Sequence, residues 1–125
     1  TGYTTAIPFL PEAISPVEEA TTHVALYNRV AHPSVPGLFF IGYFDVTGGS
    51  NIRMMDEQAA YIAAMASGAI RRPSEQDMLA AIETERAWAQ TQFPDSPRYG
   101  LELDPRRYRK RLALDYAANG VKRPV

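Results

Sequence analysis

The 125-residue sequence contains no cysteine. Disulfide bonds, catalytic thiols and cysteine-bound metals are therefore excluded, and the absence favours a cytoplasmic location over a secreted one. No apolar run approaches the roughly 20 residues that a membrane-spanning helix needs, so we expect no transmembrane segment. The formal net charge of −1 gives the chain no overall attraction to nucleic acid, which we do not expect as a partner. A composition that is 46% hydrophobic and 22% charged is typical of one ordinary globular domain.

The amino-terminal segment lacks the features of a natural beginning. Its sequence, TGYTTAIPFLPE, has no initiator methionine, no basic region and no long apolar stretch, which excludes a signal peptide. We therefore expect the chain to be a fragment of a longer protein. Five of the ten prolines lie in residues 1–36. Because proline removes a backbone donor, this region is predicted to form loops, with one weak strand within Thr22–Val30.

Residues 37–68 are predicted to form a strand, a loop and a helix. Leu38–Ile41 is a continuous apolar run, which is typical of a strand buried on both faces of a parallel sheet. Such a strand needs a neighbour on each side. The sequence offers few candidates, apart from Thr1–Tyr3 and the segment around Tyr27.

The helix of this region is predicted from apolar residues at spacings of three and four. Ser50 or Asn51 can cap its amino end, and Ser67-Gly68 provides a left-handed stop. The face predicted to be buried consists of Ile52, Met55, Ala59, Ile62 and Ala66.

Two further helices are predicted within residues 73–120. The first runs from Glu75 to about Thr91 with Ser74 as its cap. The second starts at Asp104-Pro105 and ends at Asn119-Gly120. The apolar markers of these two helices are Met78, Leu79, Ile82, Trp88 and Ala89 in the first, and Tyr108, Leu112 and Tyr116 in the second.

The remaining polar candidates favour structural interpretations. His23 and His32 have no second histidine or carboxylate at ligand spacing, so we expect surface histidines and no metal site. A basic cluster in the last helix could bind phosphate or nucleic acid, but a solvated face with local ion pairs explains it better, since acids flank it. The cluster consists of Arg106, Arg107, Arg109, Lys110 and Arg111.

The loop with Gly48 and Gly49 is the place where chemistry is most strongly indicated. It delivers backbone N–H groups to a helix amino end, which favours an anion or an electron-rich carbonyl. Glycines also allow a flat ligand to approach the backbone closely. An ordinary strand-to-helix turn explains the same glycines equally well. The spacing matches neither G-x-G-x-x-G nor a phosphate loop, so this is not a main phosphate site.

Four blocks together resemble the carboxy-terminal portion of flavin-containing monooxygenases, with Baeyer-Villiger monooxygenases as close neighbours. The order and approximate spacing of the blocks agree with that family, and they cover nearly the whole chain. They are TGY and PFLP within residues 1–11, VALYNRVAHPSVPGLFFIGY at 24–43, GGSNIRMMDEQAAYIAAMASG at 48–68 and FPDSPRYGLELDPRRYRKRLA at 93–113.

The resemblance implies a parent enzyme that uses FAD, NADPH and O2 to oxygenate a soft nucleophile at nitrogen or sulfur. It implies that residues 1–125 are the C-terminal part of the FAD-binding domain in an α/β flavoprotein with two dinucleotide-binding domains. Within this chain we expect mainly helices and one to three short strands. The residues implied to bind the cofactor are Thr1, Gly2, Tyr3, Gly42, Asp45, Gly48, Gly49, Ser50 and Asn51. Asp56, the acid of the family's acid-x-Gln-Ala pattern, is implied to support the helix end or its packing.

No catalytic residue is expected in this chain, because the family's FAD fingerprint, NADPH motif and histidine-containing signature would all precede residue 1. We therefore expect the isolated chain to be inactive and to hold neither FAD nor NADPH. Its expected partners are the missing N-terminal part of the same protein and, for the isolated chain, further copies of itself. The alternative is a small, mainly helical, self-associating interaction module without catalytic activity, which would supply its own pairing partners for Leu38–Ile41.

Overall fold

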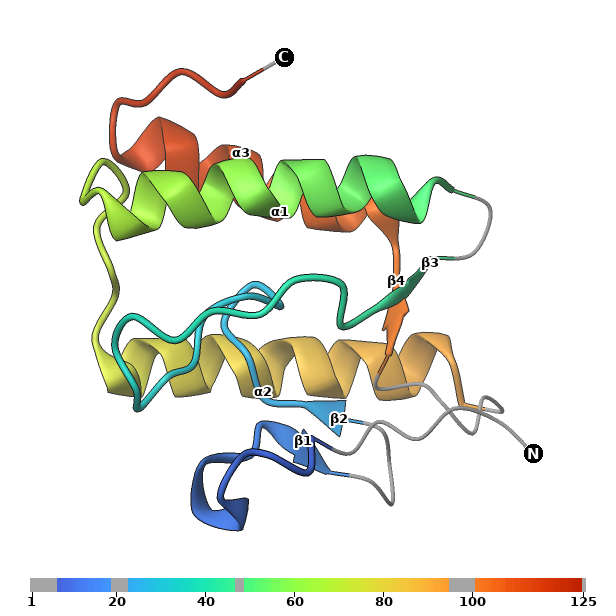
Figure 1. The fold of residues 1–125 in the computed structure, drawn as a ribbon. Coiled ribbons are helices and arrows are strands. Elements are labelled where there is room, and N and C mark those ends of the chain that lie inside the picture. The colour runs from blue at the N-terminus through green and yellow to red at the C-terminus, as the bar shows by residue number, and fades with distance from the viewer. Residues whose placement is uncertain (1–6, 19–22, 47–48, 95–100, 125) are drawn as a thin grey trace.

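Three helices dominate the architecture: α1 (Asn51–Ala66), α2 (Glu75–Gln92) and α3 (Pro105–Ala118). The computed structural model describes residues 7–18, 23–46, 49–94 and 101–124. In Figure 1, α1 and α3 lie side by side, and the long connection that precedes α1 passes between this pair and α2. This arrangement confirms the predicted chain of helices with few strands. None of the helices in the described part of the chain is both long and apolar enough to cross a membrane.

The helices begin and end where local signals predict. The Ser50 hydroxyl accepts the amide of Arg53 at 3.3 Å, and the Ser74 hydroxyl accepts the amide of Asp77 at 3.1 Å. Asp104 Oδ1 accepts the amide of Arg106 at 2.9 Å, with proline at the first position of α3. These three caps confirm the predicted amino ends. After α1, Gly68 has a φ of 82°, the left-handed conformation that glycine adopts without strain.

The predicted buried face of α1 is wrong by about one residue. The side chains that α1 buries are Met54, Gln58, Tyr61 and Met65. Ile52, which was expected to be buried, is 72% exposed. The error has a physical cause: the buried stripe contains the polar side chain of Gln58, so a search for apolar periodicity favours the neighbouring stripe. The neighbouring stripe is covered only in part by the described residues: Met55 and Ile62 are partly buried against the core, whereas Ile52, Ala59 and Ala66 are exposed.

The strands are short, and one of the two pairs joins segments that are far apart in the sequence. β1 (Val17–Glu18) pairs antiparallel with β2 (His23–Val24), which lies within the predicted weak strand. β3 (Asp45–Val46) pairs in parallel with β4 (Glu102–Leu103). This second pair joins the end of the long connection to the start of α3, as Figure 1 shows.

The prediction that Leu38–Ile41 forms a strand buried on both faces is wrong. Within this segment, Phe39 makes an isolated antiparallel bridge with Ala31, and the amide of Phe40 donates to Val30 O at 2.8 Å. Ile41 is 49% exposed. The segment folds back on residues immediately before it, and Gly42, with a φ of 87°, then redirects the chain. A local pairing of this kind cannot be distinguished from a central strand by the apolar run alone.

His32 is buried rather than on the surface, so that prediction is also wrong. Its Nε2 lies 2.7 Å from Ile14 O, and its Nδ1 accepts the amides of Ser34 and Val35 at 3.2 and 3.1 Å. With Nδ1 as acceptor, Nε2 carries the proton and donates to the carbonyl. His32 is therefore a structural anchor for the proline-rich loops.

The main core lies between α1, α3 and the connecting loops. Its members share near-complete burial, and they are Tyr27, Val30, Ala31, Phe44, Val46, Met54, Tyr61, Met65, Ile70, Met78, Leu103, Tyr108, Leu112 and Tyr116. The predicted markers of α3 all belong to it. A smaller cluster of Val24, Leu26 and Leu101 packs with Phe40 and Tyr43 near β2 and β4.

Leu112 and Leu114 on α3 provide a matched test of this core. Leu112 is 1% exposed, whereas Leu114 is 51% exposed. We expect Leu112→Ala to lower the free energy of unfolding by about 2–5 kcal/mol, because it leaves a cavity. Leu114→Ala should change it by less than about 0.5 kcal/mol. Urea denaturation followed by circular dichroism measures both, and similar losses in the two variants would contradict this core.

Candidate functional site

The described residues with a predicted cofactor-binding role lie in one stretch, from Gly42 to the start of α1. Gly42, Asp45, Gly49, Ser50 and Asn51 are all exposed. Thr1, Gly2, Tyr3 and Gly48 lie outside the described residues. The stretch runs from the end of the long connection through β3 to the amino end of α1 (Figure 1).

Backbone amides are available at the amino end of α1. The Ser50 hydroxyl is occupied by the amide of Arg53, and the helical bonding begins with the amide of Met54 on Ser50 O at 3.1 Å. Within the described residues, the amides of Asn51 and Ile52 remain for an outside acceptor. Together with the positive end of the helix dipole, they favour an anion or a carbonyl oxygen here.

The space around Gly49 is too small for a side chain. A Cβ at this position would lie 2.7 Å from Val46 Cγ1, well inside van der Waals contact. Val46 is fixed because it is buried and forms part of β3. The absence of a side chain therefore lets the loop lie close to β3, with its other side exposed to solvent.

Gln58 holds the beginning of this stretch from inside the core. Its side chain is fully buried. Oε1 accepts the amide of Gly42 at 3.0 Å, and Nε2 donates to the Tyr108 hydroxyl at 3.2 Å. The same Tyr108 hydroxyl donates to Asn28 O at 2.5 Å. One side chain of α1 thus connects the candidate loop to α3 and to the turn at residue 28.

The turn at Asn28 and Arg29 has an unusual backbone. Both residues have positive φ angles, 48° and 64°, which are uncommon for residues other than glycine. The Asn28 amide nitrogen Nδ2 donates to Asp115 Oδ2 at 3.0 Å, and Arg29 Nη2 donates to Glu102 O at 2.7 Å. Burial lowers the pKa of Arg29. These contacts fix the turn against both α3 and β4.

Asp115 accepts hydrogen bonds from two tyrosines as well. The hydroxyls of Tyr27 and Tyr61 donate to Asp115 Oδ2 at 3.0 and 2.5 Å. Burial, followed by the charge of Asp115, raises the pKa of Tyr27 to about 12. Burial and the hydrogen bond to Asp115 also raise the pKa of Tyr61. At neutral pH both hydroxyls keep their protons, so they remain donors to the carboxylate.

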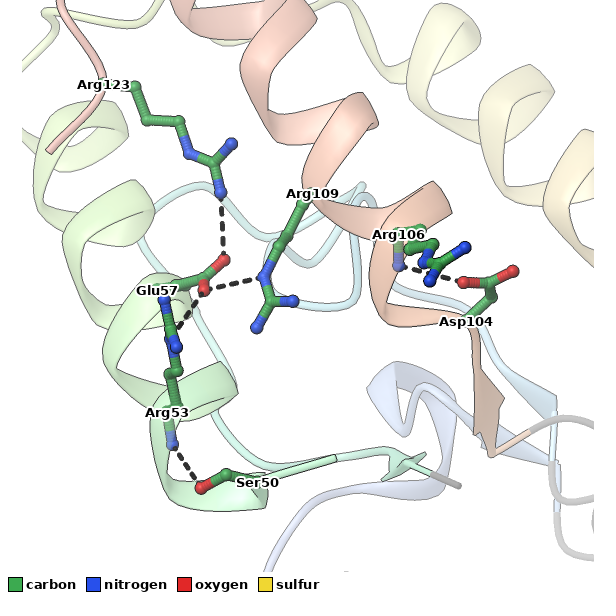
Figure 2. A network of polar contacts seen from close by, with 7 residues as sticks. All are labelled: Ser50, Arg53, Glu57, Asp104, Arg106, Arg109 and Arg123. Atoms are coloured by element: carbon green, nitrogen blue, oxygen red, sulfur yellow. Dashed lines mark hydrogen bonds and ion pairs between the residues drawn. The ribbon is translucent and has the colours of Figure 1, made fainter. Parts of the chain in front are cut away.

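Two residues of the basic cluster form ion pairs, but these pairs reach other helices and are not the local pairs that were expected. Arg107 contacts Glu85 of α2, with Nη2 2.8 Å from Oε1, and its guanidinium lies 4.3 Å from the centre of the Trp88 ring. Arg109 Nε lies 2.8 Å from Glu57 Oε1 on α1. Figure 2 shows Glu57 at the centre of this second group.

Sequence reasoning missed Gln58, Tyr108 and Asn28 as residues that shape the site. The one usable signal was the position of Gln58 in the acid-x-Gln-Ala pattern, which the resemblance left without a role. Asp56, the acid of that pattern, is exposed in this chain. The glutamine, and not the acid, connects α1 to the loop.

Comparison with known proteins gives the family to which this chain belongs. The family model for flavin-binding monooxygenase-like proteins matches residues 1–116, so the chain belongs to this family. The chain is 28% identical over 106 residues to flavin-containing monooxygenase 5 of Rattus norvegicus and to that of Mus musculus. These matches cover 83% of this chain and 19% of each relative.

A solved structure shares the fold over the full chain. It is the S-allyl-L-cysteine S-oxygenase from Allium sativum, with a TM-score of 0.74 and 25% sequence identity. The match covers 100% of this chain and 28% of that protein. The chain therefore spans less than a third of the relatives it matches.

Gln58→Leu tests the link between α1 and the loop. The change keeps the side chain close in size but removes both hydrogen bonds, leaving the Gly42 amide without its acceptor. We expect the free energy of unfolding to fall by about 1–3 kcal/mol. Gln76→Leu makes the same chemical change on the exposed surface of α2 and serves as the control. Urea denaturation compares them, and equal stability of the two variants would refute the role of Gln58.

Proposed function

We propose that this chain forms the C-terminal part of the FAD-binding domain of a monooxygenase that uses FAD, NADPH and O2. The observation that carries the proposal is the exposed glycine loop at the amino end of α1, in a chain that belongs to a flavin-binding family. When bound, FAD supplies the oxygen chemistry, and the polypeptide positions the cofactor and excludes water.

The residues present fit a role beside the flavin. Gly49 packs against Val46 of β3, where a Cβ would lie 2.7 Å from Val46 Cγ1, and the other side of Gly49 stays exposed for a ligand. The amides of Asn51 and Ile52 are suited to an electron-rich carbonyl or to the polar chain of the cofactor. Gly42 and Asp45 would hold the segment that leads into this loop, through Gln58 and β4 respectively. Thr1, Gly2, Tyr3 and Gly48 are proposed on the family resemblance alone.

The proposed substrate is a soft nucleophile oxygenated at nitrogen or sulfur. Support comes from the matched structure, which is an S-oxygenase by name. The complete gene product that includes these residues should consume NADPH when given a thioether or a tertiary amine. Faster turnover of a ketone to an ester would instead favour Baeyer-Villiger chemistry. The 125-residue chain alone, lacking a pyrophosphate site, should remain colourless and inactive.

Gly49→Ala in the complete gene product tests the loop. The added Cβ must displace Val46 or the loop, and overpacking of this kind costs about 1–3 kcal/mol. We expect FAD affinity to fall about tenfold. Gly120→Ala is the control for a loss of stability away from the loop, because its left-handed φ of 66° makes the change strained although a Cβ there meets no atom within 4 Å. Flavin absorbance after dialysis gives the FAD content. Equal FAD retention by both variants would contradict the site.

We further propose that the remaining part of the protein covers the outer face of α1. This face carries Ile52, which is 72% exposed, and the exposed Ala59, while Met55 and Ile62 are partly buried against the core. The small alanine side chains suit close packing onto a sheet. The matched relatives are several times longer than this chain, so they contain residues that could form such a sheet. Without that cover, an exposed apolar face promotes self-association.

The isolated chain should therefore self-associate through the outer face of α1. Ile52→Glu should weaken self-association at least about tenfold, because an unpaired carboxylate in an apolar contact is costly. Leu114→Glu on α3 is a matched control at a second exposed position. Sedimentation equilibrium over a range of concentrations measures both. A wild-type chain that stays monomeric at high concentration would contradict the proposal.

A further inference from the structure

A cleft of about 660 Å³ lies between α1 and α3. Arg123 and Pro124 of the C-terminal segment line one side of it. The residues that line it are Arg53, Asp56, Glu57, Ala60, Arg109, Leu112, Tyr116, Arg123 and Pro124. Its volume falls in the range of about 300–1,000 Å³ that is usual for small-molecule sites. None of the described residues of the Gly42–Asn51 stretch lines the cleft, although the amide of Arg53 donates to the Ser50 hydroxyl, and the cleft does not depend on the flavin proposal.

Three arginines converge on the single carboxylate of Glu57 in this cleft (Figure 2). Arg109 Nε lies 2.8 Å from Oε1, and Arg123 Nη2 lies 3.2 Å from Oε2. Arg53 is more distant, with Nε 3.9 Å from Oε1, and its side chain is 77% exposed. With Asp56 included, three cations face two carboxylates. The cleft is therefore positive, although the chain as a whole has a net charge of −1.

The guanidinium of Arg109 uses only one of its nitrogens in the contact with Glu57. Within the described residues it contacts Glu57 through Nε alone, so both terminal nitrogens are left for another acceptor. Arg107 on the same helix differs, because Nε and Nη2 both contact Glu85 and its face stacks on Trp88. A guanidinium edge with two free nitrogens matches the two oxygens of a carboxylate or phosphate group.

The floor of the cleft is formed in part by Leu112 and Tyr116, which are themselves buried in the core. Ala60 adds a small side chain on the α1 side. Leu112 and Tyr116 are only 1% and 4% exposed, so a ligand that places its charged end on Arg109 and Arg123 can rest a short apolar part here. Glu57 holds the two arginines in position before the ligand arrives, which lowers the entropic cost of binding.

We propose that the cleft between α1 and α3 binds a small organic dianion, a phosphate monoester or a dicarboxylate, through the free guanidinium nitrogens of Arg109 and Arg123. Glu57 positions these two arginines and at the same time limits the affinity, because its charge repels the ligand. Phosphate and carboxylate share the recognition chemistry, and the probes below distinguish them.

Isothermal titration of the 125-residue chain with phenyl phosphate, inorganic phosphate or succinate tests the proposal, with sodium chloride at equal ionic strength as the reference. Saturable binding of phenyl phosphate or succinate beyond the chloride reference is expected. Tighter binding of phenyl phosphate than of inorganic phosphate would show that the apolar floor contributes. Heats no larger than those of chloride for all three probes would overturn the site.

Three variants locate the binding. Arg109→Gln should weaken it at least about tenfold, because it removes a charge-assisted contact. Arg106→Gln should leave it unchanged, since Arg106 lies beside Asp104 and outside the cleft (Figure 2). Glu57→Gln should strengthen it several-fold by removing a like charge. If circular dichroism shows that Arg109→Gln is unfolded, Arg123→Gln replaces it. Unchanged affinity in the folded arginine variant would refute the assignment.

Discussion

The left-handed turn at Asn28 and Arg29 is the constraint on which the rest of the structure depends. Two consecutive residues in this conformation cost about 1–2 kcal/mol each. The turn persists because it is hydrogen-bonded on several sides: Asp115 accepts the Asn28 side chain, Tyr108 donates to the Asn28 carbonyl, and Arg29 donates to Glu102. The donors and acceptors belong to α3 and β4. The turn can therefore form these hydrogen bonds only when α3 and β4 are in their folded positions.

The position of the candidate flavin loop is fixed by hydrogen bonds to the same buried residues. Gln58 connects Tyr108, a partner of the turn, to the Gly42 amide where the loop begins. A loop that must face a flat cofactor needs a rigid support, and buried hydrogen bonds provide one with defined directions. The sequence pointed to the glycines of the loop, since their conformational freedom is a local property. The sequence did not identify Gln58 as the residue that supports the loop. A glutamine at a helical position carries no sign of its hydrogen-bond partners, which come from distant segments.

Features that depend on neighbouring residues could be predicted from the sequence, and features that depend on distant residues could not. The helix starts at Ser74 and Asp104 follow from hydrogen bonds within a few residues and were predicted correctly, and the cap of α1 is Ser50, one of its two predicted candidates. The strand at Leu38–Ile41 failed because pairing depends on residues that a short window does not contain. The buried face of α1 failed for a related reason. Gln58 is acceptable in the core only because its partners from other segments satisfy it.

Stability alone does not account for three arginines around Glu57. An exposed ion pair contributes about 0–1 kcal/mol, and each further arginine near the same carboxylate adds repulsion from the others. A structure selected only for the contact of α1 with α3 would gain more from a second carboxylate, as the one-to-one pair of Arg107 with Glu85 illustrates. The cleft has one more arginine than it has carboxylates, and a bound anion would supply the missing negative charge.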